Sequence, residues 1–393
     1  MHPYIKSYIM TAGPTPLPPA VSQVMAEPIL YHRAPAFIEI YARCLANLRV
    51  PFQTSNDVLA FAASGSGAME SAVFNLARRG EPAVVASCGK FGERWKELTE
   101  ALGAETIHHD AGWGNKVEPA DLDALLGAHP GVEVVFTTLS ETSTGVVNDV
   151  EQLTQVAHRH GAMIVVDAVS GLGAVPVPQD EWGVDVVVSG SQKALMCPPG
   201  LGFAAVTEAA LERAAAAPGG RYYFDWTKTA KGQRKDPPDS PFTPAVTTFM
   251  GLDVALRLIR EEGLERVFAR HRLLGRATRE AVKALDLELF GPEDENANVV
   301  TAIRLPEGIE GGKVPGRMRD HYGVTIAGGQ NQLKGQIARI AHCGYFGPFD
   351  IVTTLAAFEM TLRDLGHDVE LGAGVAAAQR VFLEADVPAG APA

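Results

Sequence analysis

The chain has 393 residues, of which 46% are apolar and 20% are charged, a composition typical of a folded protein with room for more than one domain. Its formal net charge of −12 disfavours a nucleic-acid partner, because an acidic surface repels phosphate backbones. No apolar run approaches the ~20 residues of a membrane-spanning helix, and the first residues lack the apolar stretch of a signal peptide. We therefore expect a cytoplasmic protein with no membrane partner.

The four cysteines are scattered along the chain and form no CxxC pair; they are Cys44, Cys88, Cys197 and Cys343. This spacing favours neither a disulfide scaffold nor a zinc site. We therefore expect no metal and interpret all four as reduced, mostly buried thiols.

Residues 57–206 alternate short apolar runs with helical stretches. Runs rich in Val and Ile predict strands that are covered on both faces, and their alternation with helices predicts a mainly parallel sheet with right-handed crossovers. We expect strands at 58–63, 83–87, 106–109, 132–139, 163–167 and 184–189, and helices at 68–78, 93–102, 120–126 and 149–160.

The pattern changes after residue 250. Two long helices rich in Arg and Glu are predicted at 252–262 and 264–285, followed by a strand at 299–304, a helix at 312–322, a strand near 339–342 and a helix at 350–365. The sequence thus predicts a large α/β domain over 15–250 and a smaller α+β domain over 251–385. We expect the segment 1–14 to pack near the functional site.

The first chemical feature is the loop Ser64-Gly65-Ser66-Gly67-Ala68, which follows a predicted strand and opens a predicted helix. Glycines let a ligand approach the backbone, and the free N–H groups of a helix N-terminus attract an anion. The loop is a candidate phosphate site, with an ordinary tight turn as the alternative. A P-loop is excluded, since no Gly-Lys-Ser or Gly-Lys-Thr follows.

The second feature is Asp167, which closes the apolar run Ile164-Val-Val. It stands at the carboxyl end of a buried strand, where open α/β sheets bind ligands. A buried carboxylate needs a cationic partner or takes up a proton. The alternative for Asp167 is a helix cap or a turn residue.

The third feature is Lys193, in the polar run Ser189-Gly-Ser-Gln-Lys193 just after a predicted strand. A lysine at this edge of a sheet can form a Schiff base with a carbonyl, whereas a lone lysine is ordinarily a solvated surface residue. The three features together, in this chain order, supply the phosphate cradle, the acid and the amine that pyridoxal 5′-phosphate requires. Their combination outweighs each alternative taken singly.

On these residues and further motifs, the chain resembles a class V, fold-type I aminotransferase of the group that holds alanine–glyoxylate and serine–glyoxylate (serine–pyruvate) transaminases. The resemblance runs over nearly the whole chain. The further motifs are Gly13-Pro-Thr-Pro-Leu-Pro18, Tyr31-His32-Arg33, Glu141-Thr-Ser-Thr-Gly145, Val166-Asp-Ala-Val-Ser170, Pro198-Pro-Gly200 and Arg339-Ile340. It implies pyridoxal 5′-phosphate as cofactor, small amino-acid and 2-oxo-acid substrates, ping-pong transfer of an amino group, and a homodimer with shared active sites.

The resemblance also implies a role for each matching residue. Lys193 would form the Schiff base and move the substrate's Cα proton, and Asp167 would pair with the ring nitrogen of the cofactor. The cofactor's phosphate would be held by the backbone N–H groups of Ser66, Gly67 and Ala68, by Gln192, and by Thr243 reaching in from a second subunit. Phe91 would stack on the ring, Thr142 would lie near its hydroxyl, Arg339 would clamp the substrate α-carboxylate, and Gly13 would border the substrate pocket.

Two positions depart from the family pattern: Phe91 stands where the glyoxylate enzymes carry Trp, and Ala68 stands where some relatives carry His. The stretch Gly328-Gly-Gln-Asn-Gln-Leu-Lys-Gly335 resembles an aspartate- or phosphoserine-handling branch instead. The donor (alanine, serine or aspartate) and the acceptor (glyoxylate or pyruvate) therefore stay open. Arg33 and Lys334 either read a second anionic group or form surface or interface ion pairs.

Three other functions compete with this interpretation. A cysteine desulfurase-like lyase shares the fold but needs a nucleophilic cysteine shortly before the substrate arginine; residues 327–339 contain none, and Cys343 comes after Arg339. A dinucleotide-binding oxidoreductase using the glycine loop leaves Asp167 and Lys193 without a role. A non-catalytic binding protein on this scaffold is expected to have lost one of those two residues, and both are present.

Overall fold

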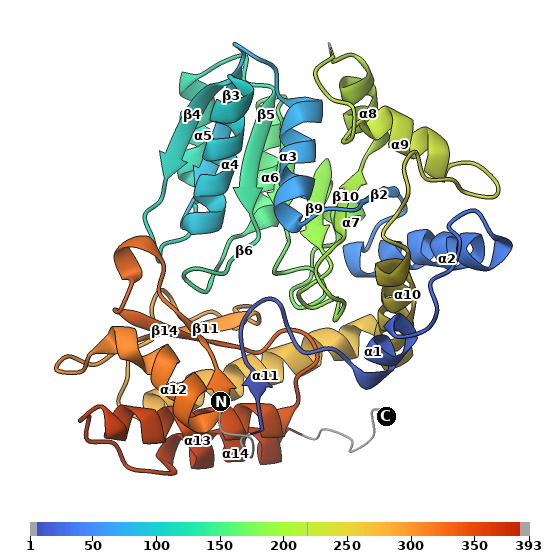
Figure 1. The fold of residues 1–393 in the computed structure, drawn as a ribbon. Coiled ribbons are helices and arrows are strands. Elements are labelled where there is room, and N and C mark those ends of the chain that lie inside the picture. Colours follow the sequence, from blue (N-terminus) through green and yellow to red (C-terminus); the bar gives the residue numbers. More distant parts are fainter. Residues whose placement is uncertain (1–5, 218, 386–393) are drawn as a thin grey trace.

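The computed structural model describes residues 6–217 and 219–385, and a seven-stranded sheet forms its larger part (Figure 1). The strand order is β2-β10-β9-β8-β5-β3-β4. The bounds are β2 (Asp57–Phe61), β3 (Pro82–Ser87), β4 (Glu105–Asp110), β5 (Val134–Thr138), β8 (Met163–Asp167), β9 (Val186–Gly190) and β10 (Gly202–Val206). Only β10 runs antiparallel to its neighbours, β2 and β9. The predicted mainly parallel α/β sheet is confirmed.

Helices cover both faces of this sheet, because successive strand residues point to opposite sides. In β8, Val165 packs into one apolar cluster, whereas Ile164 and Val166 pack into the other. The first cluster takes apolar residues from α3 (Gly65–Leu76), α4 (Lys90–Leu102), α8 (Glu208–Ala215) and α9 (Trp226–Gln233). The second takes them from α2 (Pro35–Phe52), α5 (Pro119–Ala128), α6 (Val150–Arg159) and α10 (Val246–Glu262).

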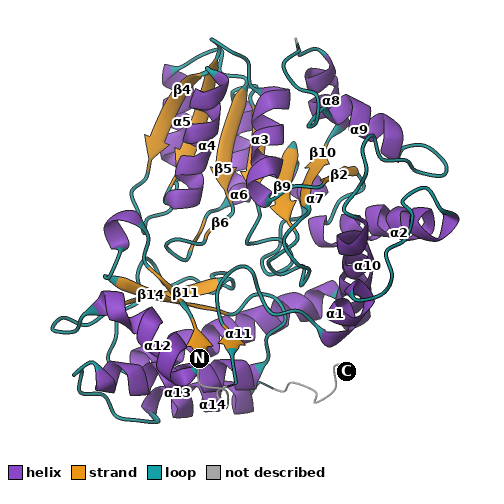
Figure 2. Ribbon diagram, viewed as in Figure 1, coloured by secondary structure: helices purple, strands orange, loops and turns teal. Residues whose placement is uncertain are grey.

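The C-terminal part is built on a three-stranded antiparallel sheet, β11-β14-β13 (Figure 2). Its elements are α11 (Leu264–Ala284), β11 (Val300–Arg304), α12 (Val314–Tyr322), β12 (Val324–Thr325), β13 (Ala327–Gly328), β14 (Ile337–Ala341), α13 (Pro348–Asp364) and α14 (Ala373–Glu384). The N-terminal strand β1 (Tyr8–Ile9) pairs with β12, and α1 (Pro19–Met25) contacts α10. The shorter elements are β6 (Ser140–Glu141), β7 (Val146–Val147) and α7 (Gln179–Trp182).

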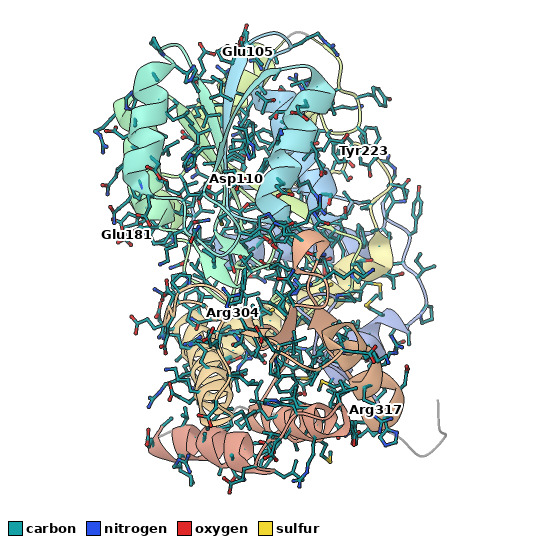
Figure 3. The ribbon with its side chains drawn as sticks, turned by 90° about the vertical axis from the view of Figure 1, so that its left-hand side faces the viewer. Glu105, Asp110, Glu181, Tyr223, Arg304 and Arg317 are labelled. Carbon is teal, nitrogen blue, oxygen red and sulfur yellow. The ribbon has the colours of Figure 1, made fainter. Side chains whose placement is uncertain are left out.

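The carboxyl ends of the parallel strands face the C-terminal part. Figure 3 shows this along β4, where Glu105 lies at the far end of the large part and Asp110 lies nearer to Arg304 of β11. The N-terminal chain reaches the same junction, since Met10 bonds to Thr325 at 2.8 Å and accepts a bond from Ala341 at 3.1 Å. The edge of the sheet where Asp167 and Lys193 are expected is therefore enclosed between the two parts.

Several helices begin earlier than predicted, and the shifts of two of them matter for the site. The helix predicted at 68–78 begins at Gly65, and the helix predicted at 93–102 begins at Lys90. Apart from Phe91, the residues of their first turns are small or polar, so these turns lack the apolar periodicity on which the prediction relied. Strand β10 and helices α1, α2, α8, α9 and α14 were not assigned from the sequence.

The predicted domain boundary at 250/251 falls inside α10. The division into domains over 15–250 and 251–385 therefore remains a proposal. Residues 1–5 of the predicted segment 1–14 lie outside the described residues. Within the described ranges, none of the helices combines the length and apolar character that a membrane crossing requires.

Candidate active site

Asp167 and Lys193 are positioned by two adjacent parallel strands, β8 and β9. Asp167 ends β8 opposite Val188 of β9, and Lys193 follows three residues after β9 ends at Gly190. Both side chains are buried, with relative exposures of 4% for Asp167 and 9% for Lys193. The Nζ atom of Lys193 donates a hydrogen bond to the carbonyl oxygen of Ala12. The N-terminal chain thus covers the lysine, so it is not the solvated surface residue that was the alternative.

The environment of Lys193 favours its neutral form. Burial is the main reason that its pKa is lowered, and the guanidinium groups of Arg339 and Arg94 lower it further. Cys343 and Asp167 act in the opposite direction. A neutral amine can attack a carbonyl or accept a proton, which an ammonium group cannot do.

Asp167 is a buried carboxylate without a full cationic partner. Burial raises its pKa to about 7, although the Val169 N–H donates to Oδ1 at 2.7 Å. The charge of Glu141 raises the pKa too, whereas Arg94 and Lys193 lower it. No ion pair within 4.0 Å joins Asp167 to a cation among the described residues. A protonated ring nitrogen is a group that this carboxylate could pair with.

Replacing Asp167 with Asn is expected to stabilise the cofactor-free protein at pH 8. Between the unfolded pKa near 3.9 and the folded pKa of about 7, the folded state binds a proton that the unfolded state does not. The wild type therefore loses stability as pH rises through this window, by up to about 4 kcal/mol. Denaturant unfolding should show that Asp167→Asn raises the free energy of unfolding at pH 8 and that this increase becomes smaller toward pH 4. The exposed Asp368→Asn serves as control; a gain independent of pH would contradict the expectation.

The glycine loop forms the N-terminus of α3, and its backbone N–H groups differ in whether they are already hydrogen-bonded. Ser64 caps the helix, since its Oγ accepts the Gly67 N–H at 3.4 Å and its carbonyl accepts the Ala68 N–H at 3.1 Å. The Ala68 N–H is therefore occupied, and the residue is fully buried. Gly65 and Ser66 donate no backbone hydrogen bond within the described structure. Of the three expected donors, Ser66 is therefore free in the described structure, and Gly65 adds a second free donor because α3 starts earlier; the roles of Gly67 and Ala68 stay predictions.

Gln192 lies beside this helix end. A Cβ atom added to Gly190 would lie 2.9 Å from Oε1 of Gln192 and 3.2 Å from the Gly65 nitrogen. The Oε1 atom is buried and has no hydrogen-bond partner. The amide oxygen can only accept a hydrogen bond, so toward an anion Gln192 would turn its N–H2 group, beside the unused donors of Gly65 and Ser66. These residues therefore fit the phosphate of a cofactor.

Phe91 is held in place by a buried carboxylate to which the sequence assigned no individual role. Oε2 of Glu141 accepts the N–H groups of Phe91 at 3.0 Å and of Gly92 at 2.9 Å, in the first turn of α4. Oε1 accepts from the backbone and the hydroxyl of Ser143 at 3.0 and 2.6 Å. The Phe91 ring centre lies 6.0 Å from Nζ of Lys193. The motif Glu141-Thr-Ser-Thr-Gly145 was the signal, but the partner of Glu141 is 50 residues away.

Arg339 projects from β14 toward the same place. Its Nη1 donates to the carbonyl of Thr142 at 2.6 Å, and its Nε donates to the carbonyl of Gly328 at 2.9 Å. The Thr142 hydroxyl donates to Ser170 Oγ at 2.8 Å. Arg339 is 7% exposed and makes no ion pair with a carboxylate among the described residues. A buried guanidinium without a counter-ion is suited to a substrate carboxylate.

A second arginine reaches the site and was missed from the sequence. Nη1 of Arg94 donates to Ser66 Oγ at 3.0 Å, and its guanidinium carbon lies 5.0 Å from the Phe91 ring centre. Its position three residues after Phe91 on a helix was a signal for a shared face. The target, Ser66, is 28 residues away and could not be inferred.

Gly13 contacts Lys193 so closely that no side chain fits there. Its φ is +121°, and an added Cβ would overlap Cδ and Cε of Lys193. Gly13→Ala is expected to displace the amine and reduce kcat by about 10²-fold or more, since a misplacement of ~1 Å can cost that much. Steady-state assays would compare it with Gly131→Ala, whose φ is +99° and whose added Cβ meets no atom within 4 Å. Equal losses in both variants would mean that backbone strain, not contact with Lys193, is responsible.

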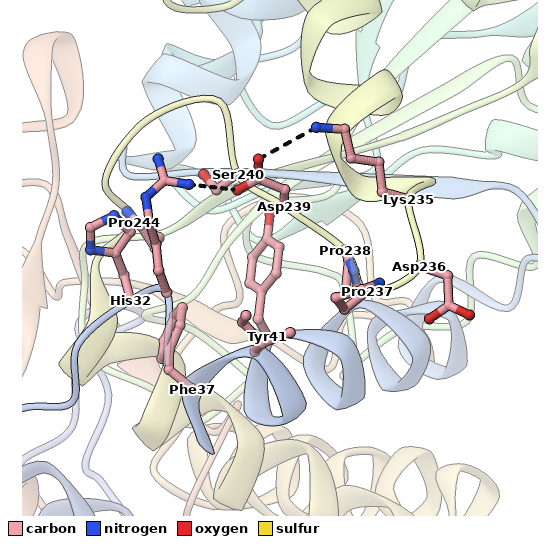
Figure 4. A pocket seen from close by; sticks show the side chains of 12 residues that line it. His32, Phe37, Tyr41, Lys235, Asp236, Pro237, Pro238, Asp239, Ser240 and Pro244 are labelled. Carbon is pink, nitrogen blue, oxygen red and sulfur yellow. Dashed lines mark ion pairs between the residues drawn. The ribbon is translucent and has the colours of Figure 1, made fainter. Parts of the chain in front are cut away.

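The remaining predicted residues lie apart from this cluster. Thr243 is exposed on the loop between α9 and α10, and no hydrogen bond among the described residues ties it to Lys193 or Asp167. Its role in a second subunit therefore stays a prediction. Arg33 is exposed and lies 3.7 Å from Asp239, which also pairs with Lys235 at 3.5 Å (Figure 4). Lys334 is exposed on the loop before β14.

A sheet whose carboxyl edge carries a buried lysine, a buried carboxylate and free helix N–H groups defines the fold-type I class of pyridoxal-phosphate enzymes. The sequence profile described as aminotransferase class-V matches residues 7–341. The chain belongs to this family, whose members are known to use pyridoxal phosphate. The protein is thus an aminotransferase, and the predicted resemblance is confirmed.

Three similar proteins span nearly the whole chain. The "soluble hydrogenase, small subunit" of Synechococcus sp. is 43% identical over 97% of this chain and 99% of its own length. The serine–glyoxylate aminotransferase of Methylorubrum extorquens is 34% identical over 96% of each chain. The crystal structure of a pyridoxamine–pyruvate aminotransferase from Mesorhizobium loti superposes with a TM-score of 0.92 at 26% identity, covering 98% of this chain and 99% of the other.

Proposed function

We propose that this aminotransferase uses pyridoxal 5′-phosphate and moves an amino group between a small L-amino acid (alanine, serine or aspartate) and glyoxylate or pyruvate, by a ping-pong mechanism. The observation that carries the proposal is the buried amine of Lys193, held against Ala12 and Gly13 and next to the strand that ends in Asp167. The names of the serine–glyoxylate and pyridoxamine–pyruvate relatives support the two oxo acids.

The residues present fit the cofactor at each of its polar groups. Asp167 would hold the ring nitrogen, Phe91 would lie on the ring, and Thr142 would lie near the ring hydroxyl. The N–H groups of Gly65 and Ser66, with Gln192, would hold the phosphate. When bound, the cofactor supplies an electron sink that stabilises negative charge at the substrate Cα.

The protein's own contribution is to bind the substrate and to move a proton. Arg339 binds the α-carboxylate, which the amino acid and the oxo acid have in common, so one clamp serves both half-reactions. Lys193, whose pKa is lowered by burial, accepts the Cα proton as a neutral amine and returns it afterwards. Burial of both residues keeps bulk water from competing for this proton.

We further propose a homodimer in which each subunit completes the other's site. Thr243 supports this, because it is exposed next to Phe242 and Tyr223, and Tyr223 is itself 38% exposed. A second subunit on this surface would bring the hydroxyl of Thr243 to a phosphate site that Thr243 does not reach within its own chain. All four cysteines are free and buried, which supports the reducing cytoplasm as the compartment.

The desulfurase alternative has little support. It requires a thiolate nucleophile, and Cys343 is fully buried with a pKa raised to about 11 by that burial. The name of the cyanobacterial relative denotes a redox reaction of hydrogen. Lys193, Asp167 and Arg339 have no role in such a reaction, whereas amino-group transfer uses all three.

A donor and acceptor panel tests the proposal. Purified protein would be mixed with alanine, serine or aspartate while the cofactor spectrum is followed, and then with glyoxylate, pyruvate or 2-oxoglutarate. We expect a donor-induced loss of the long-wavelength band and its recovery with glyoxylate or pyruvate. A protein that shows no response to any of the three donors would contradict the proposal. Hydrogen uptake with an artificial electron acceptor, measured on the same sample, tests the reaction implied by the cyanobacterial name.

A further inference from the structure

Arg94 connects the two elements that would surround the cofactor's phosphate. It lies one residue beyond the first turn of α4, and its Nη1 bonds to the hydroxyl of Ser66 at the N-terminus of α3. Its guanidinium carbon lies 5.0 Å from the centre of the Phe91 ring. The side chain is therefore oriented by two contacts, one polar and one aromatic.

Arg94 makes no close ion pair, although its charge is near enough to Asp167 to lower the pKa of that carboxyl. No carboxylate lies within 4.0 Å of it among the described residues. The nearest acids in sequence are engaged elsewhere: Glu93 accepts from Trp113 at 2.7 Å, and Glu97 pairs with Lys90 at 2.8 Å. In a chain with a net charge of −12, an unpaired and half-buried arginine needs an explanation.

The groups that Arg94 meets at the N-terminus of α3 add further positive charge and supply no negative charge. The N-terminus of α3 carries positive partial charge, and the N–H groups of Gly65 and Ser66 are unused. A guanidinium held at such a helix end is repelled unless an anion lies between them. Gln192, also at this end, is neutral, so the helix end and Gln192 alone would leave a phosphate dianion without a formal positive charge to balance it.

We propose that Arg94 is the charged ligand of the cofactor's phosphate ester, and that it sets the preference of this site for phosphorylated over unphosphorylated pyridoxal. The inference rests on the proposed function. Charge-assisted hydrogen bonds are roughly twice as strong as neutral ones, so the arginine contributes a large share of the selectivity. Ser66 positions it, and Phe91 keeps its guanidinium plane near the ring.

The test compares two ligands that differ only in the phosphate. Dissociation constants for pyridoxal 5′-phosphate and for pyridoxal would be measured by absorbance titration of the full-length cofactor-free protein. Arg94→Gln keeps an N–H donor for Ser66 but removes the charge. It should weaken binding of the phosphorylated ligand by about tenfold to a hundredfold and change binding of pyridoxal by less than about twofold. Arg94→Lys should give an intermediate loss.

Lys96→Gln is the matched control, because Lys96 lies on the same helix, is partly exposed and lies 3.8 Å from Glu100. It should leave both constants unchanged. Equal weakening of both ligands by Arg94→Gln would overturn the inference in favour of a structural role. An unchanged constant for the phosphorylated ligand, with a raised KM for aspartate, would overturn it in favour of a substrate ligand. If the wild type bound neither ligand, the proposed cofactor itself would be wrong.

Discussion

Replacing Lys193 with alanine is expected to reduce the rate of amino-group transfer by at least about 10³-fold while leaving the fold and part of the cofactor binding intact. The structure holds this amine against Ala12 and Gly13, and the lowering of its pKa by burial favours the neutral form that can accept a proton. The phosphate cradle and Asp167 do not depend on it, so cofactor binding should persist in weakened form.

Single-turnover absorbance measurements with each donor would quantify this loss, since they report the proton transfer without product release. Lys283→Ala is a suitable control, because Lys283 is a surface residue that pairs with Glu280 and Glu293. Partial recovery of Lys193→Ala by an added small primary amine would support a proton-transfer role. If Lys193→Ala kept the wild-type rate, Lys193 would not transfer the proton and the proposed mechanism would be wrong.

Replacing Arg339 with leucine is expected to lower kcat/KM by about 10²- to 10³-fold for the amino acid and for the oxo acid alike. Both substrates present an α-carboxylate, and Arg339 is the buried guanidinium that β14 brings to Thr142. Leucine fills similar space without a charge, so the substrate carboxylate would be buried without a partner. Arg339→Lys should recover only part of the loss, because an ammonium group cannot make the two parallel hydrogen bonds of a guanidinium.

Steady-state kinetics of both half-reactions would check this expectation. Arg317→Leu is the control, since Arg317 is a partly exposed arginine paired with Asp364. A loss confined to one half-reaction would show that Arg339 reads a feature that the two substrates do not share. Unchanged saturation in both half-reactions would mean that another group binds the carboxylate.

Much of the sheet could be predicted because its strands are locally encoded. The Val- and Ile-rich runs that became β3, β5, β8 and β9 are buried on both faces, so hydrophobicity alone marks them. Helix starts were less predictable. The first turns of α3 and α4 are defined by a serine cap and by a distant glutamate, and the early start of α3 places the Ala68 N–H within the helix, where it bonds to Ser64.

The sequence by itself determined that the glycine loop, Asp167 and Lys193 lie at one edge of the sheet. Each follows a predicted parallel strand, and the carboxyl ends of parallel strands meet at the same edge. Only the tertiary structure decided what surrounds them. Lys193 bonds to a carbonyl 181 residues away, and Arg339 bonds to one 197 residues away. Such contacts depend on how whole segments pack, which no local pattern encodes. The unpaired charge of Arg94 and the capping carboxylate of Glu141 became visible only once those segments were assembled.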